Sequence, residues 1–341
     1  MHATLVFLAL ALPPTLPAAP ITAPLLTSLE EDFSHSPPKE LFDILYVVDG
    51  DTVHIQYHGK KEKLRLLSVD TEEKGDVGPT KPATVFGQEC AVWADEFFTK
   101  QAKEGKAPRI GLIFPDGKER RDIFGRLLCY VILEDGTNFN LMLVQLGKSP
   151  YFNKYGNSTV CHKEFVKAQK QAKKAKLGIW NPKTNKPKEE GRVSASRPYP
   201  ELLAWWEARA QAIDNFRTKM AKQPKLWIDA EDPEALKRAI ELGTEVNVFC
   251  ILDRKEFDEK DGSKTYLMRS GDKRSTLRVI VPSKLREAHT TKLDFDALRA
   301  EFEQNYLFVK GKIVKGGRGP ELHSTGPEQW SLAGPKPVMP K

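Results

Sequence analysis

Apolar and polar residues alternate from position 52 to 57, in the run TVHIQY, and this period of two is typical of a half-buried β-strand. A His-Gly-Lys turn follows. The return strand at 64–69, LRLLSV, is apolar on both faces except at Arg65. Because an unpaired buried charge is too costly to keep, we expect the Arg65 guanidinium to be paired or used.

Beyond this hairpin, the pattern predicts three helices and a further strand in the first half of the chain. Apolar residues recur at helical spacing at 87–103, and a short helix is expected at 139–147. A third helix at 163–176 is rich in lysine. The further strand is expected at 127–133. These elements predict one folded domain over residues 41–182.

A second folded unit is predicted toward the C-terminus. Residues 183–224 combine a linker rich in Lys, Pro, Gly and Ser with an amphipathic helix at 202–220, whose tryptophans are expected to dock on a neighbour. From 225 to 334, three strands, a helix and two further strands are predicted, which is the element order of an OB-fold barrel. These elements are 245–257, 265–270, 276–281, 295–304, 306–315 and 320–324.

The N-terminus has the pattern of a targeting segment. An apolar run at 5–12 is too short to span a bilayer, and it is followed by prolines and small residues. We therefore expect a signal peptide over 1–20, a disordered leader over 21–40, and export to the cell envelope or beyond. No other stretch has a transmembrane pattern, so no membrane association is expected after signal removal. We expect a monomer.

Charge and cysteine usage narrow the functional classes. The 341 residues carry a formal net charge of +7, which favours polyanionic partners without identifying them. The four cysteines are scattered without any CxxC pair, which disfavours a zinc site. Cys129 and Cys250 lie inside apolar strand patterns and are expected to be buried thiols. If a disulfide forms, it would join Cys90 and Cys161.

Three acidic residues flank the predicted hairpin. Asp51 precedes the first strand, Asp70 follows the second, and Glu73 lies three residues further on, so strand pairing brings them to the same end of a sheet. Clustered oxygen ligands without His or Cys suit Ca²⁺ or Mg²⁺. A second arginine, Arg126, leads into the strand at 127–133. Two guanidiniums, a hard-metal site and a spare carboxylate are what phosphodiester hydrolysis requires.

Each of these residues also has an ordinary structural explanation. Asp51 lies in an Asp-Gly-Asp run that is typical of a turn. Glu73 begins a loop at 74–84 where a solvated acid is usual, although a flexible lid over the site would also fall there. Arg126 follows a glycine and could be a surface turn residue. The functional interpretation therefore depends on these residues occurring together, and not on any one of them alone.

The motifs VVDGDTV, RLLSVDTEE, DIFGR and AQKQAKKAKLGIW occur in the order and approximate spacing of the thermonuclease (staphylococcal nuclease) family. The resemblance covers roughly residues 42–182. It implies a five-stranded OB-type β-barrel with three helices, in an all-β or α+β fold. It also implies that Ca²⁺ is bound by Asp51, Asp70 and the backbone carbonyl of Thr71.

The same resemblance implies the catalytic roles. Glu73 would activate the attacking water, while Arg65 and Arg126 would hold the phosphate and stabilise the pentacoordinate transition state. Members of this family cleave DNA and RNA to leave 3′-phosphates. The chain thus resembles an exported Ca²⁺-dependent nuclease. The alternative is a catalytically weak or inactive nucleic-acid-binding scaffold, and the choice between DNA and RNA stays open.

This sequence departs from the family pattern at the substrate-contacting positions. Ile123 and Phe124 stand where the family usually has a lysine and a tyrosine that contact a terminal phosphate. Asn153 replaces one of two base-stacking tyrosines, and Tyr155 keeps the other. Phe124 can still stack on a base but cannot donate a hydrogen bond. We expect Phe124 and Tyr155 to contact substrate.

The predicted C-terminal barrel shows no catalytic or metal-binding constellation. Its first three strands and their loops carry several basic residues, where OB-folds hold single strands. The alternative is a structural barrel that packs on the nuclease, because a fold alone does not give a function. The basic residues are Arg254, Lys255, Arg269, Lys273, Arg274 and Arg278.

Overall fold

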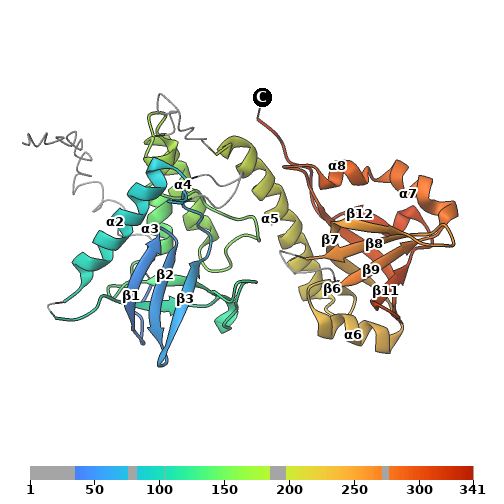
Figure 1. The fold of residues 1–341 in the computed structure, drawn as a ribbon, viewed down its shortest axis with the longest axis horizontal. Helices are drawn as coiled ribbons and strands as arrows, with labels where there is room; N and C mark the ends of the chain where they lie inside the picture. Colours follow the sequence, from blue (N-terminus) through green and yellow to red (C-terminus); the bar gives the residue numbers. More distant parts are fainter. Residues whose placement is uncertain (1–34, 76–82, 104, 185–196, 271–275, 341) are drawn as a thin grey trace, which may run out of the picture.

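The computed structural model describes residues 35–75, 83–103, 105–184, 197–270 and 276–340. It shows two β-barrels with a long helix, α5, between them (Figure 1). The predicted signal peptide, most of the predicted leader, most of the predicted lid and the middle of the predicted linker lie outside the described residues. Across the described chain, no helix is both long enough and apolar enough to cross a membrane.

The first barrel has five strands, in the order β1-β2-β3-β5-β4, and it closes where β1 pairs with β4. All its pairings are antiparallel except that between β3 and β5. This confirms the predicted five-stranded OB-type barrel. The strands are β1 (Phe42–Asp49), β2 (Thr52–Tyr57), β3 (Lys60–Leu66), β4 (Arg109–Ile113) and β5 (Leu127–Ile132).

The predicted hairpin is β2 and β3. Every second residue of β2 is buried, at Val53, Ile55 and Tyr57, which confirms the alternating pattern. The turn places His58 at φ 44° and Gly59 at φ 79°. Two successive residues with positive φ form the turn type that matches the twist of paired strands, and this fixes the register of the hairpin.

In the part of the chain that the structure describes, three α-helices cover the barrel, as predicted, with small differences at their ends. A polar side chain caps the first two: Thr84 accepts a hydrogen bond from the Gly87 amide, and Asn138 accepts one from the Leu141 amide. The helices are α2 (Val85–Gln101), α3 (Phe139–Gln145) and α4 (His162–Lys174), with short 3₁₀ turns at Pro115–Gly117 and Gly178–Trp180.

The second barrel repeats the strand order of the first. Its five strands follow the order β7-β8-β9-β11-β10, it closes through β10 and β7, and β9 and β11 are parallel. Two short strands extend its sheet beyond the prediction. The strands are β6 (Trp227–Asp229), β7 (Glu245–Asp258), β8 (Lys264–Arg269), β9 (Leu277–Val281), β10 (Tyr306–Gly316), β11 (Gly319–His323) and β12 (Trp330–Leu332).

The helices of the second unit correct one prediction. The helix expected at 295–304 is α8 (Phe295–Arg299), and the prediction that it continues to Gln304 is wrong. The backbone becomes extended at Ala300. Phe302 then has φ 62°, which an α-helix does not accommodate. The other helices are α6 (Pro233–Leu242) and α7 (Arg286–Lys292), with 3₁₀ turns at Ser283–Leu285 and Pro327–Gln329.

Helix α5 (Tyr199–Lys222) packs on both barrels. Trp206 meets Phe152 of the first unit edge to face, at 4.8 Å between ring centroids. Phe216 stacks on Phe249 of β7 at 4.5 Å with nearly parallel rings. The prediction that this helix docks on a neighbour is thus confirmed.

All four cysteines are free and buried. This confirms the prediction for Cys129 and Cys250. The disulfide between Cys90 and Cys161 does not form, because the two residues lie in different hydrophobic clusters. Burial raises the pKa of the Cys161 thiol to about 11 and that of Cys90 to about 12, so both stay protonated near neutral pH.

Candidate active site

Asp51 lies in the turn between β1 and β2 and is held there by two hydrogen-bond donors. The Thr71 amide donates to its Oδ2 at 2.9 Å and the Thr52 hydroxyl to its Oδ1 at 3.1 Å. Only 4% of Asp51 is exposed. Gly50 permits this arrangement, because a Cβ there would lie 2.7 Å from the Thr71 methyl group. The carboxylate is therefore fixed before any ligand binds.

Asp70 follows β3 and is fully buried. Its amide donates to the Ser149 hydroxyl at 2.8 Å, which anchors the backbone to the loop after α3. Its two carboxylate oxygens each accept from a different arginine. Arg65 Nη2 donates to Oδ1 at 2.8 Å, and Arg197 Nη2 donates to Oδ2 at 2.6 Å.

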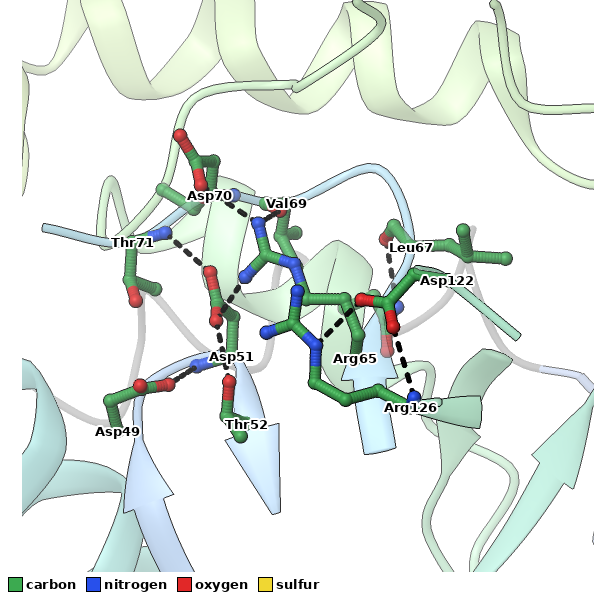
Figure 2. Close-up of polar contacts among 12 residues, drawn as sticks. Asp49, Asp51, Thr52, Arg65, Leu67, Val69, Asp70, Thr71, Asp122 and Arg126 are labelled. Carbon is green, nitrogen blue, oxygen red and sulfur yellow. Dashed lines mark hydrogen bonds and ion pairs between the residues drawn. The ribbon is translucent and has the colours of Figure 1, made fainter. Parts of the chain in front are cut away.

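Arg65 joins the two acids. Its guanidinium forms an ion pair with Asp51 through Nη1 and with Asp70 through Nη2, and it also donates to the Val69 carbonyl at 3.3 Å (Figure 2). Burial disfavours its charge, but the two carboxylates more than offset this and raise its pKa. We expected the Arg65 guanidinium to be paired or used, and the structure shows it paired. Asp51 and Asp70 thus converge on one positive charge.

Asp49, which the sequence identified only as part of a turn, lies beside Asp51. Its Oδ1 accepts the Asp51 amide at 3.1 Å. Burial, together with the negative charge of Asp51, raises the pKa of the Asp49 carboxyl to about 7. Asp49 is half-buried, and a carboxyl held close to a second one is typical of a site that favours cations.

Arg126 approaches this cluster from the neighbouring strand. It directly precedes β5, whose Leu127 pairs with Leu64 of β3, and Figure 2 shows its guanidinium on the same side as that of Arg65. Its Nε donates to Asp122 Oδ2 at 2.6 Å. Asp122 Oδ1 also accepts the Arg126 amide at 2.9 Å, so the turn and the side chain are fixed together.

The remaining predicted site residues are all at least partly exposed. Glu73 is partly exposed, and its backbone forms a bridge with Ala83 just before α2. Phe124 is 76% exposed, with its ring 5.5 Å from the Arg126 guanidinium. Tyr155 is also exposed. The catalytic role of Glu73 and the substrate contacts of Phe124 and Tyr155 stay predictions.

The segment at the start of α5 contributes to the site, which the sequence did not predict. Arg197 lies in the predicted linker, yet it is 8% exposed and contacts Asp70. Tyr199 is buried and its hydroxyl donates to Glu72 Oε1. Burial raises the pKa of the Glu72 carboxyl, although the hydrogen bond from Tyr199 and the charge of Arg197 oppose this. No spacing rule connects these residues, which are 127 positions apart.

The donor set fits a hard divalent cation. Asp51 and Asp70 are buried carboxylates that converge on a guanidinium, which shows that the space between them favours positive charge. With the backbone carbonyl of Thr71 they would supply only oxygen ligands, as Ca²⁺ prefers. Among the described residues, no three His, Cys, Asp or Glu side chains converge on one point. Water or substrate would therefore have to complete the coordination.

A closed OB-type barrel that carries buried carboxylates and two arginines at one end is a domain suited to phosphate esters. Comparison with known proteins finds a matching family model over this part of the chain. Residues 63–182 match the family model described as staphylococcal nuclease homologue. The chain contains a staphylococcal-nuclease-like domain, followed by a second OB-like barrel.

Three relatives illustrate the extent of the similarity. An uncharacterized protein of Bacillus anthracis is 31% identical over 138 residues, which cover 40% of this chain and 59% of that protein. The thermonuclease of Staphylococcus hyicus is 29% identical over 144 residues, covering 42% and 77%. The SPbeta prophage-derived endonuclease YokF of Bacillus subtilis is 33% identical over 146 residues, covering 42% and 45%. The similarity is thus partial on both sides.

Proposed function

We propose that this protein is an exported, Ca²⁺-dependent nuclease that hydrolyses phosphodiester bonds of DNA, RNA or both and leaves 3′-phosphates. The observation that carries the proposal is the convergence of Asp51 and Asp70 on Arg65, with Arg126 entering from the adjacent strand. The match to the nuclease family and the names of two relatives, a thermonuclease and an endonuclease, support the reaction class.

In this proposal each side chain has a distinct task. Asp51, Asp70 and the Thr71 carbonyl hold Ca²⁺, which when bound would neutralise charge on the phosphate. Glu73 accepts a proton from the attacking water. Arg65 and Arg126 donate to the phosphate oxygens, where a planar fork matches the geometry of the pentacoordinate transition state.

Substrate would be recognised by exposed aromatic rings beside these groups. Phe124 extends from the turn that fixes Arg126 and could stack on a base. The second barrel could add a binding surface through Arg254 and Lys255, which are exposed. Arg278 contributes less charge than its sequence suggests, since it lies 3.4 Å from a Glu259 carboxylate oxygen and 3.7 Å from one of Glu321. Lys273 and Arg274 lie outside the described residues.

One observation favours the alternative, a catalytically weak nucleic-acid-binding scaffold. Both carboxylate oxygens of Asp70 are engaged by arginines, which leaves this ligand less available to a metal ion. The experiment that decides is degradation of end-labelled DNA and RNA with Ca²⁺ or with chelator. We expect cleavage with Ca²⁺, none with chelator, and products whose 3′ ends become extendable by a polymerase only after phosphatase treatment. Binding without cleavage would favour the scaffold.

A further inference from the structure

The segment at 197–199, here called the arm, places a positive charge on a carboxylate of the candidate active site. Arg197 Nη2 lies 2.6 Å from Asp70 Oδ2, and its Nη1 lies 3.5 Å from the Asp70 carbonyl oxygen. Because an arginine side chain stays protonated in proteins, Arg197 places a permanent positive charge at this position.

The arm is anchored by contacts that do not involve Asp70. The Arg197 guanidinium lies 5.5 Å from the Tyr199 ring and 5.9 Å from the Trp206 ring, within the range of cation–π attraction. Tyr199 donates to Glu72, and both residues are buried. Trp206 is on α5 and packs against Phe152, in the loop after α3 of the first unit. The guanidinium is thus held in place by the helix that also packs on the second barrel.

The charges explain what this guanidinium does to the site. Asp51 and Asp70 together carry two negative charges, and Arg65 with Arg197 carries two positive charges, so the four side chains are balanced without a metal ion. A divalent cation between the carboxylates would leave the group with an excess of positive charge. At short range and partial burial such repulsion is strong. Cation binding therefore favours departure of a guanidinium.

We propose that Arg197 competes with the divalent cation for Asp70, and that the arm thereby sets the cation affinity of the site. This inference rests on the proposed function, because it assigns Asp70 as a cation ligand. Of the two arginines on Asp70, Arg65 is expected to turn to the substrate phosphate, so Arg197 is the one that competes with the cation. Arg197 adjoins α5, which lies outside the barrel and is also hydrogen-bonded to the second unit from Trp205 to the Glu303 carbonyl. Movement of α5 would therefore alter the cation affinity of the site.

The test is calorimetric titration of Ca²⁺ into the full-length protein without nucleic acid. We expect Arg197→Gln to bind Ca²⁺ about tenfold more tightly or better, because a positive charge is removed next to the ligand. Arg197→Lys keeps the charge and should bind like the wild type. Arg217→Gln is the matched control, since Arg217 is an α5 arginine whose ion pair is with Asp214. Asp70→Asn should abolish the heat signal.

The sign of the change separates competition from a structural role. If Arg197 only positioned Asp70, the Gln variant would bind Ca²⁺ more weakly, and weaker or unchanged binding overturns the inference. A second measurement uses the wild type alone: added Ca²⁺ should increase hydrogen exchange of the amides at 199–206, because loss of the Arg197–Asp70 ion pair loosens the start of α5, and reduced or unchanged exchange contradicts this. Cleavage is assayed in parallel. If Arg197→Gln binds Ca²⁺ more tightly but the protein cleaves no nucleic acid, only the nuclease proposal is refuted. If the protein cleaves nucleic acid but Arg197→Gln leaves Ca²⁺ affinity unchanged, only the competition by Arg197 is refuted.

Discussion

Removal of the central guanidinium should destabilise the first barrel far more than removal of an outer one. In Arg65→Met, Asp51 loses its counter-charge while keeping the Thr52 and Thr71 hydrogen bonds, and Asp70 keeps Arg197. The Asp51 and Asp70 side chains are 5% and 1% exposed. Removing one partner of a buried ion pair costs about 3–5 kcal/mol of folding stability. Because both carboxylates keep other partners here, we expect a loss near the lower end of this range.

The matched control is Arg126→Met. The side chains of Arg126 and Asp122 are 23% and 17% exposed, and Asp122 keeps its hydrogen bonds from two backbone amides. A loss of about 1 kcal/mol is therefore expected, as for more solvated pairs.

Urea unfolding in chelator measures both losses. With a denaturant slope of roughly 2 kcal/mol per molar, the midpoint should fall by about 1.5 M for Arg65→Met and by about 0.5 M for the control. Added Ca²⁺ should recover part of the larger loss, because a cation bound between the two carboxylates stabilises the folded state by mass action. Equal midpoints for the two variants would refute the view that Arg65 compensates buried charge.

Three further predictions test other parts of the molecule. Glu73→Gln should lower kcat by roughly 10²–10⁴ with little change in substrate binding, as measured by single-turnover cleavage and equilibrium binding. Phe216→Ala should cost about 3–5 kcal/mol in thermal or urea unfolding, because its buried ring stacks on Phe249. Burial, with the charge of nearby Glu231 adding to it, raises the pKa of Asp229 to about 6, so the stability that the protonated Asp229 contributes is lost as pH rises through that value. The free energy of unfolding of Asp229→Asn, relative to that of the wild type, should therefore rise by about 2–3 kcal/mol from pH 4 to pH 8. A difference that does not change with pH would contradict this.

The parts of the fold that could be predicted were those with a local pattern. The alternation in β2 and the turn at His58 and Gly59 specify the hairpin within a dozen residues. The hairpin in turn places Asp51 and Asp70 at one end of the sheet, so that part of the candidate site followed from sequence. Strand β4 was not predicted. It is short and partly exposed, and it is fixed by pairing with β1 and β5, which a local pattern cannot reveal.

The contribution of Arg197 could not be predicted for a similar reason. Its flanking composition is that of a linker, and its partner Asp70 is 127 residues away. The contact exists because α5 packs its Trp206 against Phe152 and so brings the start of the helix to the site. The position of Arg197 therefore depends on tertiary packing, of which the sequence shows only the amphipathic pattern of the helix.

The most direct test of the site is the single-turnover cleavage rate of labelled DNA and RNA by Arg126→Lys at saturating Ca²⁺, with Arg217→Lys as the control. A lysine keeps the charge of Arg126 but cannot reproduce its bidentate fork, so we expect a loss of about 10²-fold or more in the cleavage step while substrate binding is largely kept. The control should cleave at the wild-type rate. A wild-type rate for Arg126→Lys on both substrates would contradict the assignment of this end of the barrel as a phosphodiesterase site.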